Sequence, residues 1–301
     1  MRIIFVPVLK RKIYIFVPIF VSGSSQLLIK RQARESLGGR IKLFLIDPLS
    51  YGEWLALNKK EIPLKKVDIH QEELQKFFFW FARTPFPEIA TLREPFLINQ
   101  YITEMIVSKA LSYDLPKIFK EADLELLETL QHLFFQQPGY ILNFDSLAKD
   151  LGRRKETIRN HVFFMEQAQL IRILKNYRGS LTSSSRKLRR VYPSHPALTV
   201  GLREDIFIEN LFVSLLKSDF YWREGNQEVD IIKSGLPVEI KWQEKIGREE
   251  TKHLFSFLKK FKKQQGYIIC KEEKEFSEGN KKISAYPYWK AAFLVQEEIF
   301  S

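Results

Sequence analysis

Three residues in the last third of the chain have the types and spacing that metal-dependent phosphodiester chemistry needs. Asp230 lies in one strand-like run, and Glu239-Ile240-Lys241 lies in the next. Because side chains alternate along a strand, Glu239 and Lys241 should share one face. Carboxylates that converge from adjacent strands can hold Mg²⁺, which prefers oxygen ligands, and a lysine can orient or deprotonate the attacking water. We therefore predict that Asp230, Glu239, Lys241 and, from the preceding helix, Glu209 are catalytic. Of these, Asp230, Glu239 and Glu209 are the predicted ligands of a Mg²⁺ cofactor.

The elements predicted around these residues follow the order of the PD-(D/E)XK nuclease core, to which this part of the chain is similar. That core runs helix, three strands, helix, strand. The corresponding segments are a helix over 203–216, strands over 220–223, 227–233 and 236–242, a basic amphipathic helix over 248–263 and a strand over 266–270. An amphipathic strand with Glu and Lys on its wet face is also common in proteins without such a site. The pattern predicts a nuclease-like fold and leaves cleavage open, because fold does not imply function.

A second predicted unit, over 119–200, has the pattern of a winged-helix domain. Its later elements are a short helix capped by Asn143 or Asp145, a turn at Gly152, a helix over 155–168 and strand-like runs over 170–177 and 188–192. In such domains the second helix enters a major groove and the wing meets phosphates. DNA contacts are therefore predicted for Arg154, Lys155 and Arg159 on the helix and for Arg186, Lys187, Arg189 and Arg190 on the wing. Winged helices also serve as protein–protein spacers, so a protein partner is the alternative.

Composition limits the class of protein. The chain has 301 residues, of which 45% are hydrophobic and 28% charged, a balance that excludes wholesale disorder. Lys and Arg number 48 against 36 Asp and Glu, and the excess of +12 suits a polyanionic partner such as nucleic acid. Cys270 is the only cysteine, so intrachain disulfides and cysteine-rich zinc sites are excluded. No segment reaches the roughly 18 uninterrupted apolar residues of a membrane span, so we expect a cytoplasmic protein without membrane contact.

The patterns together resemble a prokaryotic family of predicted AAA+-type ATPases that end in a winged-helix plus PD-(D/E)XK nuclease-like domain of unknown function. The resemblance covers nearly the whole chain from about Ile13 and rests on the order of short elements. These are Val21-Ser22-Gly23-Ser24-Ser25, Glu35-Ser36-Leu37-Gly38-Gly39-Arg40, Pro48-Leu49-Ser50-Tyr51-Gly52-Glu53, Pro85-Phe86-Pro87-Glu88, Asp114, Glu209-Asn210, Glu228-Val229-Asp230 and Val238-Glu239-Ile240-Lys241. The resemblance implies that Ser24, Ser25 and Arg40 are left from an ATPase core, whose sensor strand faces the γ-phosphate in complete members.

The chain departs from that family at the nucleotide site. Complete members bind ATP through a G-x-x-x-x-G-K-[ST] loop, whose backbone N–H groups and lysine hold the phosphates. No Gly-Lys-Ser or Gly-Lys-Thr occurs in this chain, and the acidic strand that holds Mg²⁺ with the nucleotide would lie before residue 1. We therefore expect a member that lacks the front of its ATPase domain and neither binds ATP tightly nor hydrolyses it. His195 stands where the family usually has an Asp.

The predicted fold class is mixed α/β in four parts. They are a remnant of a P-loop ATPase sheet over 1–47, a helical lid over 48–118, the winged helix over 119–200 and the nuclease-like module over 201–301. Three functions stay open. The first is a DNA-binding protein whose winged helix and nuclease-like module act without ATP turnover. The second is a Mg²⁺-dependent DNA endonuclease that uses Asp230, Glu239 and Lys241. The third is a protein-interaction scaffold in which both modules are degenerate.

Overall fold

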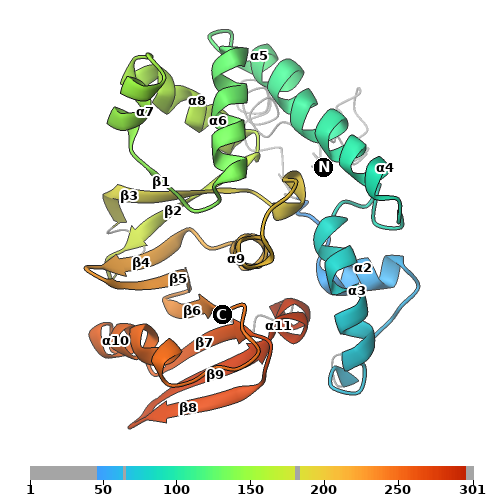
Figure 1. The fold of residues 1–301 in the computed structure, drawn as a ribbon, viewed down its shortest axis with the longest axis vertical. Coiled ribbons are helices and arrows are strands. Elements are labelled where there is room, and N and C mark those ends of the chain that lie inside the picture. The colour runs from blue at the N-terminus through green and yellow to red at the C-terminus, as the bar shows by residue number, and fades with distance from the viewer. Residues whose placement is uncertain (1–45, 64–65, 180–183, 296–301) are drawn as a thin grey trace, which may run out of the picture.

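A mixed α/β fold, as predicted, is seen in the computed structural model, which describes residues 46–63, 66–179 and 184–295, without the side chains of 184–187. Within these ranges, nine strands form one sheet in the order β1-β3-β2-β4-β5-β6-β7-β9-β8 (Figure 1). The strands are β1 Tyr140–Leu142, β2 Ile171–Tyr177, β3 Ser184–Pro193, β4 Phe220–Glu224, β5 Gln227–Lys233, β6 Leu236–Ile240, β7 Gln265–Cys270, β8 Lys274–Glu278 and β9 Lys281–Pro287. The predicted ATPase residues Ser24, Ser25 and Arg40 lie outside the described ranges.

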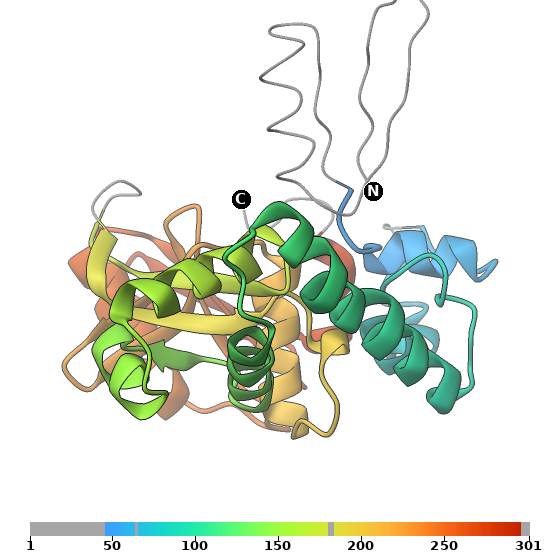
Figure 2. The same cartoon turned by 90° about the horizontal axis from the view of Figure 1, so that it is seen from above.

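The helices gather around this sheet and extend away from it at one side (Figures 1 and 2). They are α2 Tyr51–Leu57, α3 Gln71–Arg83, α4 Pro95–Gln100, η2 Tyr101–Ser108, η3 Ala110–Asp114, α5 Leu115–Ile118, α6 Leu124–Gln136, α7 Phe144–Asp150, α8 Lys155–Gln167, η4 Pro196–Leu198, α9 Glu204–Leu215, η5 Glu249–Thr251, α10 Lys252–Lys260 and α11 Tyr288–Leu294. Of the helices in the described ranges, none combines the length and the apolar character that a membrane crossing requires.

The C-terminal part of the sheet has helices on both faces. Strand β7 shows this through its alternating side chains. Tyr267 and Ile269 belong to the apolar cluster that includes α9 and α11, whereas Ile268 and Cys270 belong to the cluster that includes α10. Strands β4, β5 and β6 are antiparallel neighbours, and β6 and β7 are parallel. The predicted order helix, three strands, helix, strand is therefore present as α9, β4, β5, β6, α10 and β7.

The preceding part has the helix and strand order expected of a winged helix. Helix α6 is followed by β1, α7, α8 and the antiparallel pair β2–β3, and β1 pairs with β3 on its other edge. Asn143 is the N-cap of α7, because its Oδ1 accepts hydrogen bonds from the N–H groups of Asp145 at 3.0 Å and Ser146 at 3.2 Å. Gly152 has a φ of +61°, which lets the chain turn sharply before α8.

These two parts share one sheet, because β2 pairs with β4 in parallel. The ladder is short, with Lys175 opposite Phe220 and Asn176 opposite Tyr221. The buried Asn176 side chain reinforces it by donating to the Arg223 carbonyl at 2.9 Å and accepting from the Arg223 N–H at 3.0 Å. Strands β1, β2 and β3 are therefore held in register with strands β4 to β9 in one sheet.

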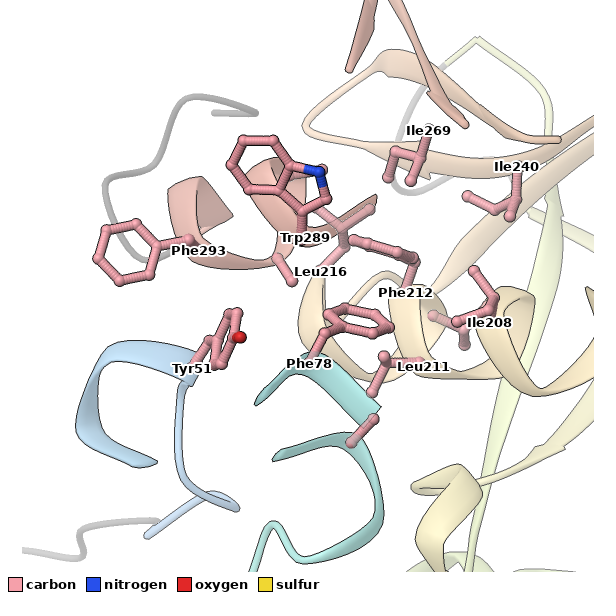
Figure 3. Close-up of a cluster of buried hydrophobic side chains, with 14 of the residues drawn as sticks. Tyr51, Phe78, Ile208, Leu211, Phe212, Leu216, Ile240, Ile269, Trp289 and Phe293 are labelled. Carbon is pink, nitrogen blue, oxygen red and sulfur yellow. The ribbon is translucent and has the colours of Figure 1, made fainter. Parts of the chain in front are cut away.

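The first part of the predicted helical lid packs into the core of the C-terminal part. Figure 3 shows Tyr51 of α2 and Phe78 of α3 directed toward Phe212 of α9 and Trp289 of α11. Tyr51 stacks on Phe81 with ring centroids 4.6 Å apart. The start of α2 is fixed by a capping box between Ser50 and Glu53. Sequence reasoning did not foresee this contact, because it joins segments more than 100 residues apart.

Replacing Phe78 by Ala tests how far α3 belongs to this core. Phe78 is fully buried, and its ring meets the Tyr288 ring edge-on with the centroids 4.6 Å apart. We therefore expect a loss of about 3–5 kcal/mol in the free energy of unfolding. Urea denaturation followed by circular dichroism measures it. The control is Phe96→Ala, at a side chain that is 75% exposed, which should cost less than about 0.5 kcal/mol. Equal stability of the two variants would show that α3 is a separate lid.

Candidate functional site

The predicted catalytic residues lie where α9 and strands β3, β5 and β6 meet. On the β5–β6 ladder, Asp230 and Glu239 come one step beyond the Ile231–Val238 pair. The Ile240 N–H donates a hydrogen bond of 2.9 Å to Asp230 Oδ2. This bond holds the Asp230 carboxylate against the strand that carries Glu239.

Lys241 lies just past the end of β6 and contacts Glu239. Its Nζ donates to Glu239 Oε1 at 2.6 Å, and the Glu239 side chain is only 6% exposed. The second carboxylate oxygen, Glu239 Oε2, is buried and has no hydrogen-bond partner in the described structure. Buried polar atoms are nearly always paired, so this oxygen indicates a position for a water or a cation.

Strand β3 adds residues that sequence reasoning did not assign to the site. The buried Tyr192 hydroxyl donates to Glu209 Oε1 at 2.7 Å. Arg190, two residues earlier, pairs with Glu228 and lies over the Tyr221 ring at 4.7 Å from its centroid. The signal that could have found them is the strand period of two, which puts residues 190 and 192 on one face.

Burial dominates the electrostatics of the carboxyl groups. Removal from water, followed by the charge of Asp230, raises the pKa of Glu209 to about 7 and that of Glu239 to about 8. Burial also raises the pKa of Asp230, against the opposing charge of Lys241. For Lys241 burial acts to lower the pKa, but the charges of Glu239 and Asp230 outweigh it and raise the pKa. We call Glu209, Asp230 and Glu239 the carboxylate cluster. At neutral pH this cluster therefore retains protons instead of carrying its full negative charge.

The donors of the cluster are carboxylate oxygens, the kind of ligand that Mg²⁺ prefers. Within residues 46–63, 66–179 and 184–295, no three His, Cys, Asp or Glu side chains are arranged as ready ligands for one ion. Mg²⁺ keeps several waters and often takes only one or two carboxylates plus a substrate phosphate. The oxygen donors are of the right kind, and Glu239 Oε2 is unpaired. Asp230 and Glu239 are the residues that can hold such an ion directly, with Glu209 beside them.

The predicted DNA-contacting residues of the helix lie on the exposed start of α8. Arg154 is its N-cap residue and is exposed. Lys155 Nζ lies 2.7 Å from Asp145 Oδ1, and Arg159 Nη1 lies 2.5 Å from Glu156 Oε2. All three basic side chains are therefore at the surface, two of them in exposed ion pairs.

The predicted wing residues differ in burial and in surroundings. Arg189 is half-buried on β3, and its Nε is buried without a partner. Arg190 lies at the carboxylate cluster, with its side chain 13% exposed, so it is not part of the open wing surface. Arg186 and Lys187 fall outside the described side chains.

A cavity of about 1340 Å³ lies away from this cluster. Segments of η2, η3 and β2 line it, together with His195, but Glu209, Asp230 and Glu239 do not. Burial lowers the pKa of His195 to about 3, and its Nδ1 accepts a hydrogen bond of 3.1 Å from the Ala197 N–H. His195 is therefore a neutral, structural residue at physiological pH.

The raised carboxyl pKa values predict that the protein loses stability between about pH 5 and pH 8. In this window Glu209 and Glu239 titrate in the folded state at about 7 and 8, whereas both are already ionised in the unfolded chain. The folded state then binds more protons, so the free energy of unfolding falls with pH, by up to about 1.4 kcal/mol per pH unit for each group. Urea denaturation across this range should show the fall in the wild type.

The Glu239→Gln variant isolates the effect, because an amide does not titrate. Its slope against pH should be shallower than that of the wild type. The control Glu125→Gln, at a side chain that is 85% exposed, should keep the wild-type slope. A wild-type stability that is flat or rises over this window would contradict the burial of these carboxyl groups.

Two consecutive segments of the chain match domain families of unknown function. Residues 74–204 match the family described as Domain of unknown function (DUF8612), and residues 201–290 match Domain of unknown function (DUF4143). The chain is also similar to Uncharacterized protein MJ1544 of Methanocaldococcus jannaschii, at 24% identity over 233 residues, which cover 72% of this chain and 53% of that protein. The chain thus spans about half the length of this curated relative. No solved structure matches this chain.

The two matched segments meet between η4 and α9. Arg190 and Tyr192, which contact the acidic residues of the site, therefore belong to the first segment, and the acidic residues belong to the second.

Proposed function

We propose that this chain binds duplex DNA through helix α8 and the β2–β3 hairpin. The observation that carries the proposal is the exposed start of α8, where Arg154, Lys155 and Arg159 precede the first exposed apolar side chain, Phe163. A helix with this surface, beside a two-stranded hairpin, suits a major groove flanked by phosphates. The net charge of +12 adds a general attraction to polyanions.

The ion pairs on α8 do not oppose this proposal. Lys155 pairs with Asp145 and Arg159 with Glu156, and all four side chains are between 46% and 75% exposed. Such surface pairs contribute about 0–1 kcal/mol. A phosphate can therefore replace the carboxylate at little cost, and release of counterions from DNA supplies the free energy of binding.

The proposal extends to the ATPase resemblance of the sequence. In that family a winged helix precedes a nuclease-like module, and the described residues contain helix and strand orders of both kinds in the same sequence. We infer that the chain corresponds to the DNA-binding end of such an ATPase.

Replacing Arg154, Lys155 and Arg159 together by Ala tests the DNA proposal. Binding should weaken for all duplex sequences alike, because phosphate contacts carry no sequence information. The slope of log K against log salt should become shallower by about 0.9 for each lost contact. Fluorescence anisotropy with a labelled duplex over a range of NaCl concentrations measures both effects.

The control is the triple replacement of Lys60, Lys66 and Lys76 by Ala, which removes the same charge. These lysines lie around α2 and α3, at the far end of the molecule from α7 and α8 in both views (Figures 1 and 2). The control should keep most of the wild-type affinity and slope. Equal losses in both triple variants would assign DNA binding to net charge alone, and no binding by the wild type would leave the scaffold function.

A second candidate function, Mg²⁺-dependent cleavage of DNA, is favoured by the unpaired Glu239 Oε2. That oxygen belongs to a buried carboxylate that already contacts Lys241 and lies beside Asp230. A bound Mg²⁺ would supply charge stabilisation at the scissile phosphate and a more acidic water. Asp230 and Glu239 would bind the ion, and the Lys241 ammonium would orient the attacking water and offset negative charge on the phosphate.

Removing one carboxylate tests this second function. We expect weak Mn²⁺ binding by the wild type and loss of that binding in Asp230→Asn, because the amide keeps the shape but removes a charged ligand. Mn²⁺ electron paramagnetic resonance gives the affinity, and nicking of supercoiled plasmid in Mg²⁺ gives the activity. As a control, Asp219→Asn changes an acidic residue whose side chain is 68% exposed and should bind Mn²⁺ like the wild type. If wild type and Asp230→Asn bind equally, or neither binds, the cluster is an ordinary structural ion network.

A further inference from the structure

Helices α8 and α10 pack on the same face of the nine-stranded sheet. Side chains alternate along β2, so Ile173 and Lys175 point to one face. Ile173 belongs to the apolar cluster that includes α8, and Lys175 lies beside Phe220 of β4, which belongs to the cluster that includes α10. In Figure 1, β2 and β4 lie between the two helices. The helix proposed to contact DNA therefore shares one side of the sheet with the basic helix α10.

The end of α10 lies against the β2–β3 hairpin. The ring centroid of Phe261, the C-cap residue of α10, is 5.1 Å from that of Tyr177, the last residue of β2. A Cβ on Gly179, two residues further into the hairpin, would come within 3.4 Å of Phe261 Cε1. The base of the hairpin and the end of α10 are therefore neighbours on this face.

Four lysines gather at this end of α10, within residues 259–263. Lys259 pairs with Glu278, and Lys260 pairs with Glu224. Within the described part of the chain, no carboxylate oxygen lies within 4.0 Å of the ammonium group of Lys262 or Lys263. Lys262 is exposed and Lys263 is half-buried. The end of α10 therefore places two cations in excess of its carboxylate partners beside the hairpin.

A pair of like charges lies on the same face, at the strands that carry α8. Lys175 of β2 is directly opposite Arg189 of β3, and like charges in that arrangement are destabilising. Burial raises the pKa of the nearby Glu166, and the charges of Lys175 and Arg189 oppose that rise, so one buried carboxyl group compensates the two cations only in part. A phosphate over this face would reduce the repulsion between Lys175 and Arg189.

We propose that duplex DNA bound by α8 and the β2–β3 hairpin also contacts the end of α10, where Lys262 and Lys263 neutralise phosphates of the same duplex. The inference rests on the proposed DNA function. It extends the DNA surface from the segment over 74–204, which contains α8, to the segment over 201–290, which contains α10. Contacts of this kind carry no sequence information, and they strengthen binding by releasing counterions.

A second helix end in the molecule supplies a matched control. Lys59-Lys60 follows α2 in the way that Lys262-Lys263 follows α10. Lys59 and Lys262 have left-handed backbones, with φ of +59° and +53°. In each pair the second lysine donates its N–H to the carbonyl five residues earlier, at 2.8 Å after α2 and 2.9 Å after α10. Glycine is the usual residue at the left-handed position of such a turn.

Two double variants therefore remove the same charges from the same backbone motif. They are Lys262→Gly with Lys263→Gln at α10, and Lys59→Gly with Lys60→Gln at α2. Fluorescence anisotropy of the full chain with a labelled duplex, over a range of NaCl concentrations, is the readout. The α10 variant should flatten the slope of log K against log salt by about 1.8, which is about 0.9 for each lost phosphate contact. The α2 variant should keep the wild-type slope.

Two further measurements complete the test. Thermal unfolding of both variants should give similar temperatures, because each gains glycine at a left-handed position. A titration at low salt should saturate at one duplex per chain, because α8 and α10 contact the same molecule. If the α10 variant unfolds, Lys262→Gly alone takes its place, with Lys59→Gly as its control and an expected change in slope of about 0.9.

Equal slopes of the α10 and α2 variants would overturn the inference, whether both match the wild type or both are flattened. The proposed function would survive that result as long as the Arg154, Lys155 and Arg159 triple variant still binds more weakly. Saturation at two duplexes per chain would also overturn the inference, because α10 would then belong to a separate site. Absence of duplex binding by the wild type would remove the proposed function and the inference together.

Discussion

The short parallel pairing of β2 with β4 is the contact on which the arrangement of the molecule depends. It comprises the Lys175–Phe220 and Asn176–Tyr221 pairs and the two hydrogen bonds of the Asn176 side chain to Arg223. Without it, β1, β2 and β3 would form a separate small sheet. With it, only β2 and β4 lie between β3 and β5, and Tyr192 and Arg190 reach Glu209 and Glu228. The presence of Tyr192 and Arg190 at the carboxylate cluster thus follows from a backbone pairing and not from any motif.

Burying so many charged groups is unfavourable, and the surrounding apolar packing explains how the fold tolerates it. Each ion removed from water costs several kcal/mol unless partners compensate. Here Lys241 and Arg190 each pair with one carboxylate, while raised pKa values let Glu209 and Glu239 retain protons near neutral pH. Apolar clusters on both faces of the C-terminal sheet supply the opposing stability. Within the described structure this compensation is incomplete, because Glu239 Oε2 is buried without a hydrogen-bond partner.

Local features of this fold could be predicted from the sequence, and distant contacts could not. The strand-like run over 227–233 predicted β5 with its observed bounds. Residue type also pointed to the turn at Gly152 and to Asn143 or Asp145 as the helix cap, of which Asn143 is the cap. The predicted helix over 248–263 is shorter, because a separate 3₁₀ turn precedes α10 and the chain turns at Lys262, where φ is +53°. The packing of Phe78 on α9 and the hydrogen bond of Tyr192 to Glu209 join residues that no local pattern relates. Asp230, Glu239 and Lys241 were found because they share one hairpin, and Tyr192 was missed because it lies on another strand.

Strand β3 links the proposed DNA surface to the carboxylate cluster. Leu188 and Tyr192 are four residues apart on β3, so at most about 13 Å of strand separates Leu188 from the residue that donates to Glu209. Leu188 has a φ of +56°, an uncommon value for a residue other than glycine. Its backbone carbonyl accepts a hydrogen bond from the Tyr221 hydroxyl. The left-handed backbone of Leu188 therefore interrupts the regular strand between the hairpin turn and the cluster, in the stretch where the β2–β3 register shifts.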